Sequence, residues 1–182
     1  FRETPFFDEQ MALIRQALTR ILEKHDPYPA LVLNRAYRIL MTNRGYENIL
    51  RHFLGADALT RFDNVYRLIF AQNGLRPYIR DWEQIEQFML SRLWDEAVTT
   101  QHAPLFELYN EITVQKSSNQ AIEYRAEIHL PMLSMTIEKD GIVARLFSTI
   151  TTLGTPLDLT TQELRIESLF PADRETELLF DQ

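Results

Sequence analysis

Hydrophobic positions recur with a helical period near the start of the chain. Met11, Ile14, Leu18 and Ile21 follow one another at spacings of 3, 4 and 3 residues, which places them on one face of a helix. The segment DEQMALIRQALTRILEKHD therefore predicts an amphipathic helix. Its apolar seam either packs on the rest of its own chain or pairs with a second subunit, and we expect a homodimer through these four residues.

The next apolar runs along the chain are shorter than the helical segment. ALVLNRAYRILMTN predicts two short strands, Ala30–Leu33 and Tyr37–Met41, joined by a tight turn. Asn43 is a residue type that caps helices, and Gly55 is one that ends them. The segment between them, RGYENILRHFL, is therefore expected to be a helix.

A helical pattern extends from Asn64 to Gln115. NVYRLIFA is apolar nearly all round, which indicates a deeply buried helix. RPYIRDWEQIEQFMLSRLWDEAV and APLFELYNEIT each carry one apolar stripe, with Pro77 and Pro104 at first-turn positions. These stripes consist of Trp82, Ile85, Met89 and Leu93, and of Leu105, Leu108, Tyr109 and Ile112.

In the last third of the chain, apolar and polar residues follow the patterns typical of β-strands. YRAEIHLPMLSMTIE and GIVARLFSTITTLG flank Lys139-Asp140-Gly141, and Asp-Gly between two apolar runs is a strong hairpin signal. ELRIESLFP alternates regularly between apolar and polar positions. A short helix, ADRETELLF, is expected to follow it.

This order of elements predicts one α+β domain. Two early strands and three late strands can close into a five-stranded antiparallel sheet, with the helical block on one face. We expect residues 1–26 to form a flanking helix and residues 27–182 to form the domain. Both alternating sets of residues in GIVARLFSTITTLG are mixed in character, which is typical of a strand covered on both faces. The helical block and the N-terminal helix would supply the two covers.

Composition narrows the class of protein. The 182 residues are 45% hydrophobic, carry a net charge of −7 and contain no cysteine. A disulfide, a thiolate metal site and a cysteine nucleophile are therefore excluded, and a reducing, cytoplasmic compartment is expected. Domains that grip nucleic acid usually present a basic face, so this chain is not expected to bind DNA by itself. No apolar run reaches the roughly 18 residues needed to span a bilayer.

Catalytic and cofactor motifs are missing from the sequence. It has no nucleophile-elbow motif, no phosphate-binding glycine loop and no histidine spacing typical of zinc sites. The stretch LFSTITTLGTP is rich in threonine, but no acid, base or oxyanion device accompanies it. Its threonines are better interpreted as β-branched strand residues. We expect no enzyme activity, no cofactor and no metal.

Three phrases nevertheless resemble one known family. PYPALVLNRAYRILMTNRGYENIL, LRPYIRDWE and ARLFSTITTLGTPLDLTTQELRIESLFPADRETELL are similar to the ligand-binding domain of MmyB-like transcription regulators, in which it follows a helix-turn-helix of the XRE type. The resemblance implies a PAS-like fold and a buried cavity for a small hydrophobic ligand, with fatty-acyl compounds as the suggested class. It also implies that DNA is bound through a helix-turn-helix domain missing from this chain.

Candidate ligand-binding residues come from the aromatic helical block, the late strands and a few polar anchors. An arginine or a tyrosine hydroxyl would suit a carboxylate head group, and His129 alternates in phase with Leu133 and Met135 on one strand. The sequence leaves open which face of the strands lines the cavity. The candidates are Tyr66, Phe70, Arg80, Phe88, Tyr109, His129, Leu133, Met135, Arg145, Phe147 and Thr149.

Two other classes of function remain open at this point. A cone-shaped α+β enzyme acting on an apolar substrate would need a buried acid–base pair, for example a carboxylate bonded to His129. A purely structural dimerisation module would have a filled core and would act through its N-terminal seam.

Overall fold

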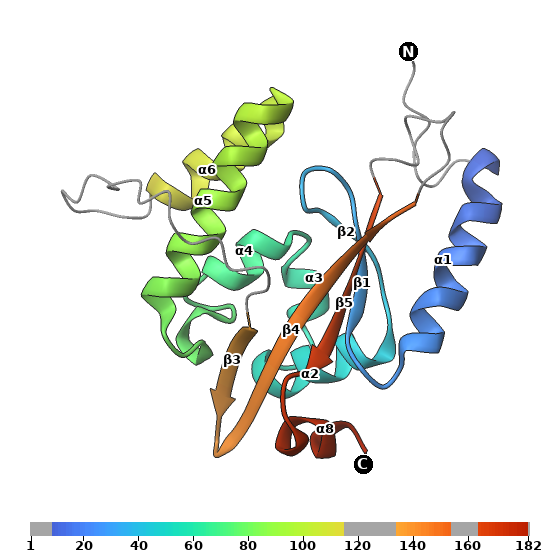
Figure 1. Ribbon diagram of the computed structural model, residues 1–182, viewed down its shortest axis with the longest axis vertical. Coiled ribbons are helices and arrows are strands. Elements are labelled where there is room, and N and C mark those ends of the chain that lie inside the picture. Colours follow the sequence, from blue (N-terminus) through green and yellow to red (C-terminus); the bar gives the residue numbers. More distant parts are fainter. Residues whose placement is uncertain (1–8, 115–133, 154–163, 182) are drawn as a thin grey trace.

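Five strands form one antiparallel sheet at the centre of the molecule. The computed structural model describes residues 9–114, 134–153 and 164–181. The strands lie in the order β2-β1-β5-β4-β3 (Figure 1), which confirms the expected α+β, PAS-like arrangement. Their bounds are Ala30–Leu33 for β1, Ile39–Thr42 for β2, Ser134–Lys139 for β3, Ile142–Thr152 for β4 and Arg165–Pro171 for β5.

Most of the helices lie between β2 and β3 in the sequence. Among the described residues, no helix is long and apolar enough to cross a membrane. The helices are η1 (Glu9–Met11), α1 (Ala12–His25), α2 (Arg44–Leu54), α3 (Ala58–Arg61), α4 (Val65–Phe70), η2 (Arg76–Tyr78), α5 (Trp82–Thr100), α6 (Ala103–Val114) and α8 (Arg174–Phe180).

The sheet is covered on both faces, as the mixed pattern of β4 predicts. Helices α2 to α6 lie on one side of it and α1 lies on the other (Figure 1). The larger apolar core fills the space beneath the helical block and includes Leu31 and Ala144. A second core lies beneath α1 and includes Val32 and Ile166. Neighbouring residues of one strand therefore belong to different cores, because strand side chains alternate between the two faces.

The seam of α1 packs on its own sheet. Met11 is 3% exposed and Leu18 is fully buried, and Ile14 packs against the same core. Ile21, the fourth residue of the expected seam, is not part of that core and is 43% exposed. The expected dimer contacts are corrected accordingly: Met11 and Leu18 are already buried within their own chain, because the apolar stripe of α1 faces the sheet.

One predicted helix is divided in two. The segment around Pro77 forms the short helix η2, and α5 begins at Trp82. Asp81 lies between them with a φ of 52°, in the left-handed region that interrupts a right-handed helix. The predicted hairpin is confirmed, since Asp140 and Gly141 have φ values of 51° and 80° between β3 and β4. Positive φ at both positions is the conformation that Asp-Gly favours in a two-residue turn.

The start of α2 is held by a buried polar contact and by a close approach. Asn43 caps the helix as predicted, since its side chain accepts a hydrogen bond from the amide of Tyr46. Gly45 lies so close to the preceding loop that a Cβ atom there would come within 2.3 Å of the Pro27 carbonyl oxygen. No larger residue fits at this position, which fixes α2 against the chain that leads into β1.

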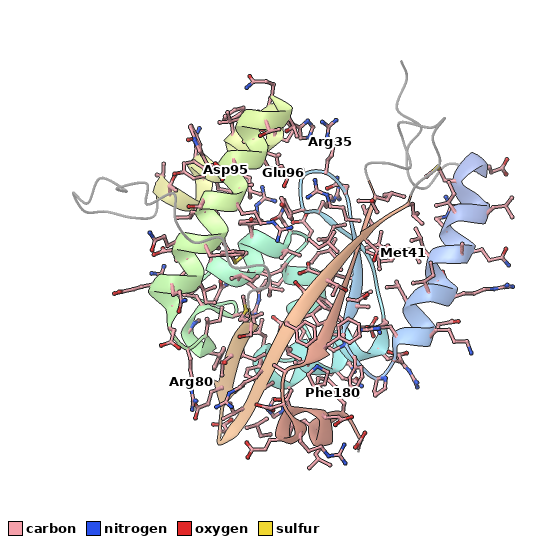
Figure 2. The ribbon with its side chains drawn as sticks, viewed as in Figure 1. Arg35, Met41, Arg80, Asp95, Glu96 and Phe180 are labelled. Atoms are coloured by element: carbon pink, nitrogen blue, oxygen red, sulfur yellow. The ribbon has the colours of Figure 1, made fainter. Side chains whose placement is uncertain are left out.

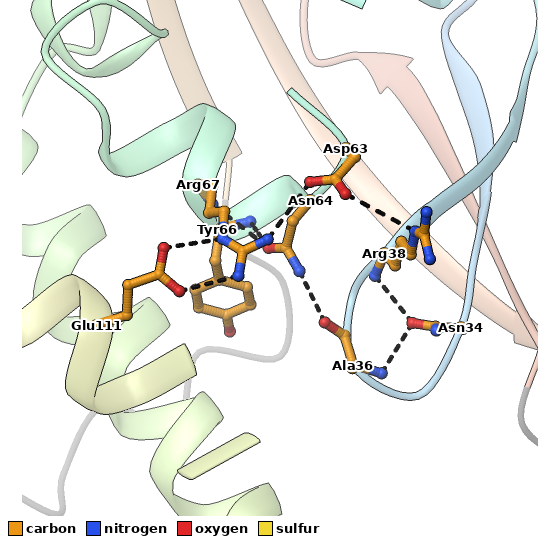
Figure 3. A network of polar contacts seen from close by, with 8 residues as sticks. All are labelled: Asn34, Ala36, Arg38, Asp63, Asn64, Tyr66, Arg67 and Glu111. Atoms are coloured by element: carbon orange, nitrogen blue, oxygen red, sulfur yellow. Dashed lines mark hydrogen bonds and ion pairs between the residues drawn. The ribbon is translucent and has the colours of Figure 1, made fainter. Parts of the chain in front are cut away.

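Polar contacts tie the turn after β1 to the helical block (Figure 3). Asn64 caps α4 and donates a hydrogen bond to the carbonyl of Ala36 at 2.8 Å. Arg67 forms two hydrogen bonds of 2.9 Å with Glu111 of α6 and an ion pair with Asp63. The short helix α4 is thereby positioned between the sheet and α6, and it supplies one wall of the site described next.

Candidate functional site

A cavity of about 220 Å³ lies between the sheet and helices α2, α4 and α5. It is larger than the cavity of about 150 Å³ that holds a benzene molecule, and by the same proportion it would hold a ligand of about nine non-hydrogen atoms. Its walls are formed by Pro29, Leu31, Tyr37, Tyr46, Ile49, Leu50, Phe53, Val65, Tyr66, Leu68, Ile69, Leu75, Phe88, Met89, Arg92, Met135, Ile137, Leu146, Ser148, Ile150, Glu167 and Leu169.

Aliphatic and aromatic side chains dominate these walls, as in most small-molecule sites. Helix α2 contributes Leu50 and Phe53, and α4 contributes Leu68 and Ile69. The sheet contributes one alternating set of β4, which includes Leu146. An apolar body would be bound here by removal of its surface from water, without directional contacts.

A carboxyl group interrupts the apolar floor. Glu167 lies near the middle of β5, where it is the cross-strand neighbour of Leu31 on β1 and of Ile150 on β4. Burial raises the pKa of Glu167, while a hydrogen bond with the Ser148 hydroxyl and the charge of Arg92 partly offset that effect. Glu167 is half-buried and lines the cavity.

A phenol lies across the cavity from the sheet. The Tyr46 side chain comes from α2, is 6% exposed, and its hydroxyl has no hydrogen-bond partner among the described residues. Burial raises the pKa of Tyr46, with a smaller contribution from the charge of Glu167. The group is therefore a neutral phenol that can donate a hydrogen bond. Arg92 differs from both groups, because it lines the cavity from an exposed position on α5.

A polar cluster joins α5 to the sheet at one end of the site. Glu96 of α5 forms an ion pair with Arg165 of β5, and both side chains are 17% exposed. Tyr37, which also lines the cavity, donates a hydrogen bond from its hydroxyl group to the carboxylate of Glu96. Burial alone would raise the pKa of Glu96, but hydrogen bonds from Arg165 and Tyr37 lower it overall. Glu96 is therefore ionised and links α5 to β5 through its ion pair with Arg165. Figure 2 shows Glu96 on the side of α5 near the strands.

Three residues expected from the sequence do line the cavity: Tyr66, Phe88 and Met135. Tyr66 is 2% exposed, and its hydroxyl donates to the carbonyl of Met89 at 3.2 Å. Because that proton is already engaged, Tyr66 contributes its ring to the wall rather than a polar contact.

Three other candidates from the helical side lie outside the cavity lining. Phe70 packs edge-on against Trp82, with 5.1 Å between ring centroids, and Tyr109 packs against Trp94. Arg80 is bound to Glu138 by a hydrogen bond of 2.6 Å, at the opposite end of the helical layer from Glu96 (Figure 2). The aromatic rings serve the core between helices, and the arginine serves a surface ion pair.

The candidates from β4 face away from the cavity, because the other alternating set of this strand lines it. Arg145 bonds to Asp173 at 3.0 Å, Phe147 stacks on Phe170, and Thr149 is exposed. All three are on the α1 side of the sheet. His129 and Leu133 lie outside the described residues.

The polar residues of the cavity wall that sequence reasoning missed are Tyr37, Tyr46, Arg92, Ser148 and Glu167. Glu167 belongs to the charged set of an alternating strand, a pattern that usually marks a solvent face. The signal that could have located it is the position of β5 between β1 and β4, since both faces of a central strand are covered. Among the described residues no cluster of three or more metal-ligating side chains occurs.

Comparisons with known proteins identify a family. The family model described as "MmyB-like transcription regulator ligand binding domain" matches residues 14–182. Among solved structures, the chain is similar to the PAS domain from Bordetella pertussis BvgS, with 14% sequence identity and a TM-score of 0.40 over 91% of this chain and 92% of that chain. None of the curated proteins compared matches the chain.

Proposed function

This chain belongs to the family of MmyB-like transcription regulator ligand-binding domains, and we propose that it senses a small hydrophobic, fatty-acyl or similar aliphatic ligand. The ligand occupies the cavity between the sheet and α2, α4 and α5. Its occupancy controls a helix-turn-helix DNA-binding domain of a bacterial regulator, which works in the cytoplasm as a homodimer. The observation that carries the proposal is the predominantly apolar cavity.

The size of the cavity suggests a ligand of medium length. An aliphatic chain of eight carbons gains about 6 kcal/mol from burial, at about 0.8 kcal/mol for each methylene. Association costs at least about 4 kcal/mol of that gain, whereas micromolar affinity corresponds to about 8 kcal/mol net. Apolar contact therefore supports weak binding of such a chain, and polar contacts determine whether the affinity reaches the micromolar range.

Native mass spectrometry of the purified chain, with extraction of co-purifying lipid, tests the proposal. We expect an adduct with the mass of an aliphatic molecule, or binding of added medium-chain compounds to the emptied protein. Met135→Trp should reduce that binding at least tenfold, because the larger side chain occupies part of the cavity.

Leu178→Trp is the matched control, since it introduces the same side chain at an exposed position of α8. It should bind as the original chain does, and melting curves of both variants show whether each is folded. A folded chain that carries no adduct and binds no aliphatic compound would count against the proposed function.

A further inference from the structure

Three polar side chains line the predominantly apolar cavity away from its exposed Arg92. Tyr46, Ser148 and Glu167, which we call the polar pole, come from α2, β4 and β5 and all line the same space. Ser148 and Glu167 lie on adjacent strands and share a hydrogen bond. The cross-strand neighbours of Glu167 are the apolar residues Leu31 and Ile150, and burying a carboxyl group among apolar side chains is unfavourable. The pole therefore needs an explanation beyond folding.

The hydrogen-bonding capacity of the polar pole is only partly used. The buried Tyr46 hydroxyl is a donor with no partner among the described residues, and leaving such a group unpaired is costly. Glu167 has two carboxyl oxygens, which can accept more bonds than Ser148 supplies. Glu167 therefore offers an occupant of the cavity an acceptor that still has capacity. The Tyr46 hydroxyl is a free donor from a residue of the cavity wall, but it is buried, so an occupant reaches it only if the Tyr46 ring shifts.

Arg92 and Glu167 both line the cavity, but they differ in charge and in exposure to solvent. Arg92 lines the cavity but is exposed, so its charge is solvated and screened. Glu167 is half-buried, and burial raises its pKa, so a ligand carboxylate placed beside it would set two like charges in a poorly solvated space. A group that both donates and accepts a hydrogen bond meets no such penalty.

We infer that the polar pole recognises an uncharged head group that both donates and accepts a hydrogen bond, such as a primary alcohol or primary amide on an aliphatic body. The ligand hydroxyl or amide donates to Glu167 and accepts from Tyr46. This inference rests on the proposed function, because it names the chemical class of ligand for the same cavity.

A set of eight-carbon probes tests the inference on the full chain after removal of lipid. The probes are 1-octanol, its isomer heptyl methyl ether, octanamide and octanoate, titrated by calorimetry at pH 8, where free octanoate is ionised. The alcohol and the ether have the same atoms, but the ether cannot donate. We expect 1-octanol and octanamide to bind at least tenfold more tightly than the ether and octanoate.

Two variants assign the preference to named groups. Glu167→Leu removes the acceptor while keeping a side chain of similar size, so the affinities for 1-octanol and the ether should become equal within about twofold. Tyr46→Phe removes the donor, so both probes should bind more weakly by a similar factor. Glu138→Gln, a change to an exposed carboxylate on β3, should leave all four affinities unchanged.

Other outcomes overturn the inference. Equal binding of all four probes by the original chain would show that the polar pole does not read the head group, while leaving the proposed function intact. Tightest binding of octanoate, lost in Arg92→Gln, would show that a carboxylate is held at the rim instead. Failure of every probe to bind, including the ether, would count against the proposed function itself.

Discussion

The side chain of Asn43 uses all of its hydrogen-bonding capacity in the buried join between α1, β1 and α2. Its carbonyl oxygen accepts from the amides of Ala30 and Tyr46, at 2.8 and 3.0 Å. Its amide group donates to the carbonyls of Leu22 and Tyr28, at 3.2 and 2.8 Å. One residue therefore serves as helix cap and as cross-link between three elements.

Asn43→Ala should lower the free energy of unfolding by about 2–4 kcal/mol, which combines a lost cap of about 1 kcal/mol with buried groups left unpaired. Chemical denaturation measures the change. Asn43→Asp keeps both accepting contacts but turns a second oxygen toward the carbonyls of Leu22 and Tyr28 in a buried site, so it should be at least as destabilising as Asn43→Ala. A loss below about 0.5 kcal/mol in the alanine variant would contradict this account of the join.

Glu167 predicts an unusual pH dependence of stability. Because burial raises its pKa in the folded chain, the unfolded chain releases this proton first as the pH rises above about 4.5. The folded state then binds more protons than the unfolded state, and stability falls with rising pH until the folded group also ionises. The charge of Arg92 and the hydrogen bond from Ser148 reduce this effect without reversing it.

Glu167→Gln removes that fall. We expect the unliganded variant to melt higher than the original chain at pH 8, by about 2–4 °C for each kcal/mol relieved, and to match it near pH 4. Thermal melts across this range test the prediction. Glu138→Gln, where the carboxylate is exposed, should show no gain at pH 8. A variant that melts lower at pH 8 than at pH 4, as the original chain does, would contradict it.

At the scale of elements, Glu96 and Arg165 tie α5 to the central strand β5. Their side chains are more buried than a surface pair but less than a pair in the core. We therefore expect Glu96→Gln to cost about 1–3 kcal/mol, between the 0–1 kcal/mol of exposed pairs and the 3–5 kcal/mol of buried ones. Denaturation with hydrogen exchange along α5 measures both the loss and its location.

Glu111→Gln is the comparison for this pair. Glu111 binds Arg67 with good geometry, but both side chains are nearly half exposed, so its loss should be at most about 1 kcal/mol. Equal losses in the two variants would mean that the burial of the Glu96 pair does not matter. Combining Glu96→Gln with Arg165→Gln should restore part of the lost stability, because the uncompensated cation is removed.

Local signals account for the elements that the sequence predicts well. Strand β1 is a run of apolar residues, and Asn43 and Gly55 mark the ends of α2 in the way such residues usually do. The break at Asp81 carries no comparable signal, because left-handed backbone at a non-glycine residue is imposed by its surroundings. Glu167 escaped sequence reasoning for a related reason: alternation separates two faces of a strand but does not say what covers each.

At the scale of the whole molecule, burial of Met11 and Leu18 means that a dimer contact through α1 would have to use the outer face of that helix. Leu13 is 79% exposed and Ile21 is 43% exposed, and they lie on one stripe of the helix, eight residues apart. We expect the dimer to use this stripe. The double variant Leu13→Glu, Ile21→Glu should therefore be a folded monomer in sedimentation velocity.

Leu18→Glu gives the opposite expectation, because it places a charge in the core beneath α1. That variant should lose several kcal/mol of stability, whatever its oligomeric state. If the double variant at Leu13 and Ile21 sediments as the original chain does, α1 does not mediate association.

The double covering of the sheet has one further consequence. On β5, Glu167 faces the cavity while Ile166, bonded directly to it, packs beneath α1. On β1, Leu31 and Val32 are related in the same way. A ligand that displaced these two strands would therefore also displace the residues that pack beneath α1, because the two sets of residues are direct neighbours along the chain.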